Sequence, residues 1–203
     1  MTATELTMFE NVVDPIAAAI GSATADQLGA PSPCAGWSAR DVLNQMIGAA
    51  DMFAACARGQ QQPFPDWSAM PDCVGADPVA AYRRSAAALT AAFGGPGVLD
   101  GAVSMPWGGM PGQFALNLIM ADQATHAWDL ARATGPEIDI PDDAVETAMA
   151  TMRVAVSPEM RATGFYGSEQ PAPEDASTFD RLAAFSGRPL LSRPLLNLQL
   201  TAV

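Results

Sequence analysis

Residues 113–135, "QFALNLIMADQATHAWDLARATG", decide the fold expected for this chain. The pattern predicts a long helix over about 113–133, with Gly135 as a natural stop after its last turn. Ala115, Leu118 and Ile119 lead into one side of this helix. Because residues three and four positions apart share a helical face, we expect that side to point into the protein.

A row of polar residues continues the inward side of this helix. Asp122, His126 and Asp129 stand at i, i+4 and i+7, and His126 is the only histidine of the chain. The row is compatible with metal ligands, with a proton-transfer pair, or with polar groups that satisfy one another inside a core. Asp129 is also placed to form a structural ion pair with Arg132 on the next turn. Trp107 is most simply a core or pocket-wall aromatic.

The flanking sequence predicts further amphipathic helices, over about 4–22, 39–58, 77–93 and 141–156, and a short one within 178–188. Ser38 with Asp41 three residues later resembles a capping arrangement. Asp77 followed by Pro78 supplies an N-cap and a first-turn proline. Several such helices with little strand signal predict an all-α bundle, with its site on inward faces between helices.

The remaining segments are connectors and a tail. Residues 59–76 are rich in proline and turn formers and are expected to form a lid or a pocket wall, and residues 98–105 a short extended piece. The apolar segment 189–203 is expected to pack or pair with something. The 203 residues suit one domain, 1–203, with a core over about 4–156 and a C-terminal extension over about 157–203.

Composition limits the partners. A formal net charge of -12 disfavours nucleic acid and anionic membrane surfaces, and all 10 cationic side chains are arginine, which excludes lysine chemistry. Cys34, Cys56 and Cys73 suggest neither a disulfide framework nor a cysteine zinc site. No signal peptide or membrane span is visible, so a cytoplasmic protein with a small-molecule substrate, monomeric or homodimeric, is expected.

Three stretches resemble a known family. They are "PSPCAGWSARDVLNQMIGAADMFA" at 31–54, "HAWDLARATG" at 126–135 and "DRLAAFSGR" at 180–188. In order and spacing the chain resembles the DinB-like superfamily, and within it the group related to the N-terminal domain of mycothiol-dependent maleylpyruvate isomerase. The resemblance implies a DinB-like four-helix bundle, with extra short helices and an irregular C-terminal tail.

The resemblance also implies a metal site. Many members of the family hold a divalent metal, often zinc or nickel, between three inward side chains. Carried over by position, the three ligands are Gln45, Asp122 and His126. The family pattern has a histidine where this chain has Gln45, and an amide oxygen is a weaker donor than imidazole for such metals.

Three functions are compatible with these residues. The first is a thiol-dependent isomerase or transferase that acts on an electrophilic or unsaturated substrate between bundle helices, with mycothiol and a metal as cofactors. The second is an isomerase or cyclase without metal or other cofactor. In it, His126 is the catalytic acid or base, Asp122 orients it, and Gln45, Trp107 and Asp129 contact the substrate. The third is a non-catalytic binding protein with a degenerate site.

Of these hypotheses, the residues favour an enzyme over a non-catalytic protein. A purely structural bundle usually replaces inward polar groups such as Asp122 and His126 with apolar residues, because burying them away from water costs free energy.

Overall fold

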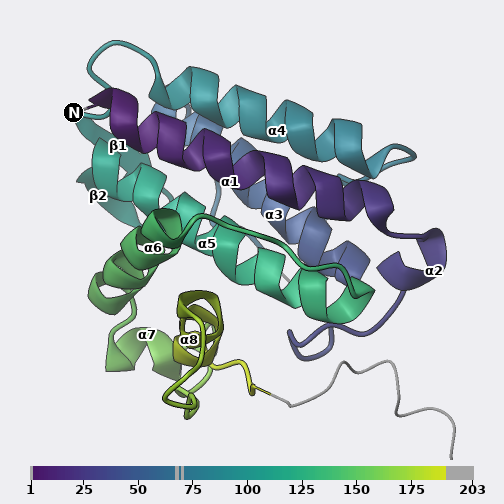
Figure 1. Ribbon diagram of the computed structural model, residues 1–203. Coiled ribbons are helices and arrows are strands. Elements are labelled where there is room, and N and C mark those ends of the chain that lie inside the picture. Colours follow the sequence, from purple (N-terminus) through teal and green to yellow (C-terminus); the bar gives the residue numbers. More distant parts are fainter. Residues whose placement is uncertain (1, 67–68, 70, 191–203) are drawn as a thin grey trace, which may run out of the picture.

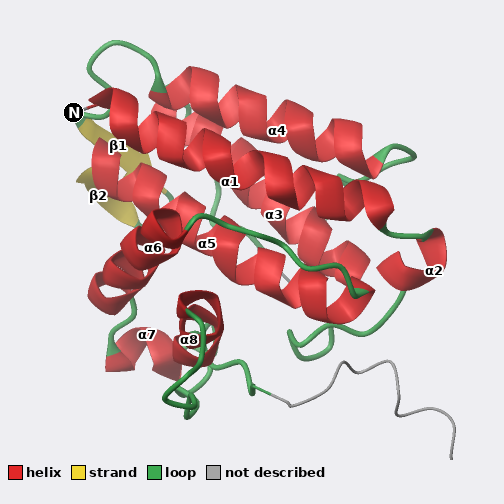
Figure 2. Ribbon diagram, viewed as in Figure 1, coloured by secondary structure: helices red, strands yellow, loops and turns green. Residues whose placement is uncertain are grey.

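Four long helices form the body of the protein. The computed structural model describes residues 2–66, 69 and 71–190. The helices are α1 (Thr2–Ser22), α3 (Ala39–Ala57), α4 (Pro78–Phe93) and α5 (Gly112–Thr134). Helices α1 and α3 each pack against both α4 and α5, so the four close around one core (Figure 1). The predicted all-α fold is confirmed, with two short strands beside the helices (Figure 2).

The predicted helix ends are set by local hydrogen bonds. Ser38 and Asp41 form a reciprocal capping box at the start of α3. The Asp77 side chain accepts a hydrogen bond from the backbone of the first turn of α4, directly before Pro78. Gly135 ends α5 in the left-handed region, with φ of 96°, which glycine adopts without steric cost. These signals are local, which is why they could be identified in the sequence.

The shorter elements lie around the bundle. They are α2 (Ala25–Leu28), the strands β1 (Ala102–Met105) and β2 (Gly108–Pro111), and the helices α6 (Asp142–Ala155), α7 (Pro158–Ala162) and α8 (Thr178–Phe185). The strands form an antiparallel hairpin, so the expected extended piece at 98–105 is confirmed only in its second half. Helices α2 and α7 and strand β2 were not predicted, because each is only four or five residues long and too short to show a period.

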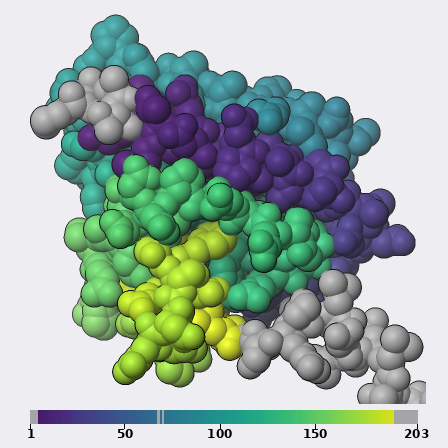
Figure 3. Space-filling view, viewed as in Figure 1, coloured from purple at the N-terminus to yellow at the C-terminus, as the bar shows by residue number. Residues whose placement is uncertain are grey.

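The C-terminal part of the chain covers one side of the bundle. Helix α6 packs on α5, and α8 packs on both (Figure 1). In the space-filling view the yellow surface of the C-terminal residues lies against the green surface of α5 and α6 (Figure 3). Most of the apolar tail expected at 189–203 lies outside the described residues. Among the described residues, no helix is long and apolar enough to cross a membrane.

Candidate active site

A cavity of about 390 Å³ lies between α3, α5 and the C-terminal part of the chain. Gln45 reaches it from α3, and Asp122 and His126 from α5. The loop over 59–76 contributes Phe64, in line with its predicted role as a pocket wall, and the hairpin turn contributes Trp107. The structure therefore brings the three expected metal-ligand positions together at one cavity.

His126 is held in one orientation by the groups around its ring. Its Nδ1 lies 3.0 Å from Asp129 Oδ2, and the indole of Trp37 stacks on the ring with centroids 6.1 Å apart. Asp129 can only accept a hydrogen bond when it is ionised, so Nδ1 carries the proton in the neutral ring. The lone pair of Nε2 is then left on the cavity side, where it can bind a proton or a metal.

Asp129 lies behind His126 and is fully buried. Arg188 donates to both of its carboxylate oxygens, from Nε at 3.2 Å and Nη2 at 2.8 Å. The expected ion pair between Asp129 and Arg132 is wrong. Arg132 instead contacts Asp180 at 3.0 Å, because Asp129 faces inward and the Arg132 side chain is partly exposed.

This network keeps Asp129 ionised. Burial by itself would raise its pKa, but the hydrogen bond from His126 and the charge and hydrogen bonds of Arg188 outweigh burial and hold the pKa below its usual range. Asp129 was expected to contact substrate. It does not line the cavity, so its geometry favours a role in positioning His126.

Asp122 is paired with amides rather than with the histidine. Gln45 Nε2 donates to Asp122 Oδ1 at 3.0 Å, and Gln123 Nε2 lies 3.4 Å from Oδ2. His126 Nε2 is 3.7 Å from Asp122 Oδ1, which is too long for a hydrogen bond. Burial raises the pKa of Asp122, and the charge of His126 and the hydrogen bond from Gln45 oppose that rise. The contact that orients His126 therefore comes from Asp129 and not from Asp122.

The donor set does not fit a zinc or nickel centre of the expected kind. Catalytic zinc takes three protein ligands that are mostly imidazole or carboxylate, and here Gln45 offers only a neutral amide oxygen. The amide nitrogen of Gln45 also donates to the carboxylate oxygen that a metal would need. Among the described residues, no group of three or more His, Cys, Asp and Glu side chains is arranged to hold a metal ion.

A single substitution should complete the metal site. Gln45→His is expected to bind about one zinc per chain, because the introduced imidazole joins Asp122 and His126 in a three-ligand set. Elemental analysis after zinc loading and desalting measures this, with wild type retaining far less. Gln60→His, which adds an imidazole on an exposed loop, is the matched control. Zinc in Gln45→His that does not exceed the amount in wild type and in Gln60→His would contradict this prediction.

Three further residues at the site were not among the predicted site residues. Cys34 and Arg188 line the cavity, and Trp37 both lines it and stacks on His126. All three lie inside stretches that carry the family resemblance, at 31–54 and 180–188, so that resemblance was the signal that could have found them.

The turn that carries Arg188 packs closely against the loop between α7 and α8. Gly187 has φ of 95°, and a Cβ there would lie 2.6 Å from the Cα of Gly167. Only glycine fits such a contact, so the turn that presents Arg188 to Asp129 depends on it.

Cys34 is expected to be an unreactive thiol. Burial raises its pKa from 9.0 to about 11, against the opposing charge of Arg188. Because the thiolate is the nucleophile, alkylation at pH 8 should be on the order of 100-fold slower in the folded protein than in the unfolded chain. Mass spectrometry of the Cys34 peptide after iodoacetamide pulses, with and without urea, measures the two rates. Equal rates would contradict the expected shift.

Comparison with known proteins gives consistent matches. The family model "Mycothiol maleylpyruvate isomerase N-terminal domain" matches residues 9–131. Two uncharacterized proteins of Mycobacterium tuberculosis, from strains CDC 1551 and H37Rv, are 35% identical over 176 residues, which is 86% of this chain and 92% of each relative.

Solved structures share the fold. Crystal structures of the mycothiol-dependent maleylpyruvate isomerase and of a mutant of it superpose with a TM-score of 0.55 at 16% identity. The match covers 81% of this chain and 72% of theirs.

Proposed function

Because the chain belongs to the mycothiol maleylpyruvate isomerase N-terminal domain family, we propose that it is a thiol-dependent isomerase or transferase of small molecules. The cavity would take an electrophilic, unsaturated substrate together with the sulfhydryl end of a low-molecular-weight thiol such as mycothiol. The observation that carries the proposal is the 3.0 Å contact of His126 Nδ1 with Asp129 Oδ2, because it leaves Nε2 of this cavity-lining histidine as the nitrogen that can accept a proton.

The residues of the site supply proton transfer and orientation. When bound, the thiol provides a sulfur nucleophile that adds to an electron-poor double bond. His126 Nε2 accepts the sulfhydryl proton, and Asp129 stabilises the resulting imidazolium through Nδ1. In a transfer reaction the imidazolium returns that proton to the substrate carbon. In an isomerisation the proton returns to sulfur when the bond to sulfur breaks again, so the thiol is regenerated.

A second candidate needs no thiol. The donor set around Gln45 does not fit the expected metal, and Asp122 lies beside Nε2 at 3.7 Å. His126 could then move a proton directly on the substrate, with Asp122 stabilising the charged ring and the Gln45 amide binding a polar group of the substrate. This is the metal-independent isomerase or cyclase.

One assay separates the candidates. The purified protein is mixed with α,β-unsaturated carbonyl compounds of different charge, with and without a thiol, and both thiol loss and double-bond absorbance are followed. The proposed function predicts turnover that requires the thiol. Turnover without thiol would support the metal-independent enzyme. Ligand-induced thermal stabilisation with no product under either condition would contradict both and support a non-catalytic binding protein.

A further inference from the structure

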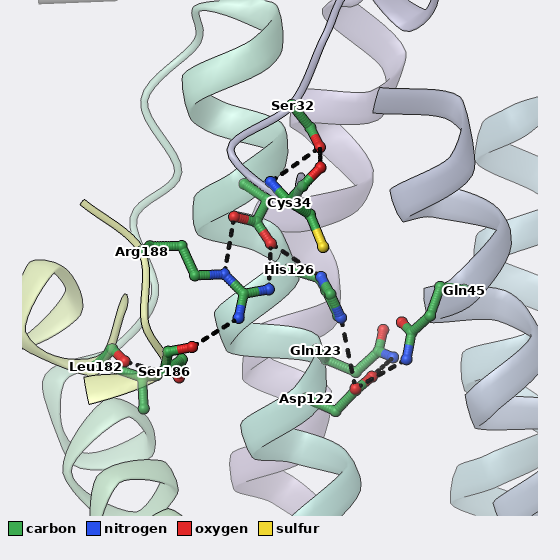
Figure 4. Close-up of polar contacts among 10 residues, drawn as sticks. Ser32, Cys34, Gln45, Asp122, Gln123, His126, Leu182, Ser186 and Arg188 are labelled. Atoms are coloured by element: carbon green, nitrogen blue, oxygen red, sulfur yellow. Dashed lines mark hydrogen bonds and ion pairs between the residues drawn. The ribbon is translucent and has the colours of Figure 1, made fainter. Parts of the chain in front are cut away.

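The deep end of the cavity presents hydrogen-bond acceptors. Gln45 is only 6% exposed and lines the cavity, and its Oε1 is buried without a partner. The Asp122 carboxylate lies beside the Gln45 amide, and His126 Nε2 points toward the same carboxylate (Figure 4). A buried acceptor left without a donor costs free energy, so this end of the cavity suits a ligand that brings N–H or O–H groups.

The lining offers little positive charge to an anion. Among the described residues that line the cavity, Arg188 is the only arginine, and the chain has no lysine. Its guanidinium already donates twice to Asp129 and once to the Ser186 carbonyl oxygen, so its charge is compensated. When Asp122 is ionised, it adds a negative charge, and its ion-pair partner in the lining is His126 at 3.7 Å, which is charged only when it is protonated. A carboxylate placed here would meet repulsion and a row of acceptors.

The mouth of the cavity is lined by exposed aromatic side chains. Trp107 contacts Phe53 and Phe64, and Phe64 contacts Phe165, with ring centroids 6.0 to 6.3 Å apart. Phe64, Trp107 and Phe165 are 58%, 43% and 48% exposed. Large aromatic side chains gathered at the opening of a cavity mark a place where an apolar group can be buried. Their ring faces also attract cations.

We propose that the unsaturated substrate of this cavity carries a protonated amine on an apolar body. The ammonium donates to Gln45 Oε1 and to the Asp122 carboxylate, and the body packs against the aromatic mouth. This inference rests on the proposed function and names the class of substrate for that same site. It also implies that a carboxylate-rich compound such as maleylpyruvate is a poor ligand of this chain.

Three size-matched probes test the proposal in the absence of any thiol. They are 2-phenylethylamine, 2-phenylethanol and 3-phenylpropionate, each titrated into the full chain by calorimetry. The amine is expected to bind at least about tenfold more tightly than the alcohol, because its donors are charged, and the carboxylate most weakly. Absence of amine binding, or a carboxylate that binds as tightly as the amine, would overturn the proposal.

A charge-matched pair of variants assigns the effect to Asp122. Asp122→Asn should remove the preference for the amine over the alcohol, and an unchanged helical circular-dichroism spectrum shows that the variant is folded. Asp100→Asn removes the same charge at an exposed position and should preserve the preference. An amine preference that survives Asp122→Asn would overturn the assignment.

The binding experiment tests the ligand class and the turnover experiment tests the reaction, so one proposal can be rejected while the other stands. Amine binding without thiol-dependent turnover would leave the ligand class standing and reject the proposed reaction. Thiol-dependent turnover of anionic electrophiles, with no amine binding, would keep the reaction and reject the ligand class.

Discussion

Arg188→Ala is expected to lower the free energy of unfolding by about 3–5 kcal/mol, the largest stability effect that we predict. Arg188 and Asp129 form an ion pair with side chains 10% and 0% exposed. Removing the guanidinium leaves the Asp129 carboxylate buried with His126 as its remaining partner. The desolvation cost of that carboxylate is then no longer offset, which is why breaking a buried pair costs far more than breaking an exposed one.

Urea denaturation measures this loss, and Arg83→Ala is the matched control. Arg83 pairs with Asp14 at the same distance of 2.8 Å, but the two side chains are 50% and 77% exposed. The control should lose no more than about 1 kcal/mol. Equal losses in the two variants would mean that the pair behind His126 does not stabilise the fold. The double variant Arg188→Met, Asp129→Leu should recover part of the loss, because it removes the unpaired charge as well.

His126→Gln is expected to lower thiol-dependent turnover by about 10²–10⁴-fold, the range that positioned proton transfer contributes. Glutamine can still donate a hydrogen bond to the buried Asp129, so the fold should be retained. It cannot accept the sulfhydryl proton, so the loss should appear in kcat. Steady-state rates with saturating thiol measure the effect, and unchanged rates would remove His126 from the mechanism.

Chemical rescue distinguishes loss of the base from loss of structure. His126→Ala leaves space beside the cavity, and added imidazole should restore part of its rate, whereas a structural defect would not respond. The wild-type protein offers a further check because its one histidine gives a single set of imidazole ¹⁵N signals. The neutral ring is expected to carry its proton on Nδ1, as the contact with Asp129 requires. A proton on Nε2 would contradict the assignment of Nε2 as the base.

The helices of the bundle could be predicted from the sequence because their signals are local. The capping box at Ser38, the N-cap at Asp77 and the stop at Gly135 depend on atoms a few residues away. The same holds for the inward row on α5, since helical geometry alone puts Asp122 and His126 on one face. Gln45 was placed opposite them only through the family resemblance, and the structure brings its amide to 3.0 Å from Asp122.

Contacts between distant segments could not be predicted in this way. Helical spacing favoured Arg132 as the partner of Asp129, but Arg188, 59 residues away, takes that position. Spacing gives the candidates for an ion pair, whereas burial decides between them: an inward carboxylate needs a cation that is also buried.

By itself, the sequence determined that this chain forms a helical bundle with a polar row facing inward, because hydrophobic period and capping act within one helix. Only the tertiary structure decided which partners the polar residues of this row have. Packing of the C-terminal segment on α5 brings Arg188 to Asp129. Asp129 in turn contacts Nδ1 of His126, so Nε2 is the ring nitrogen that remains for chemistry in the cavity. The physical reason is that the state of a buried titratable group depends on which charges and donors surround it, and those come from distant parts of the chain.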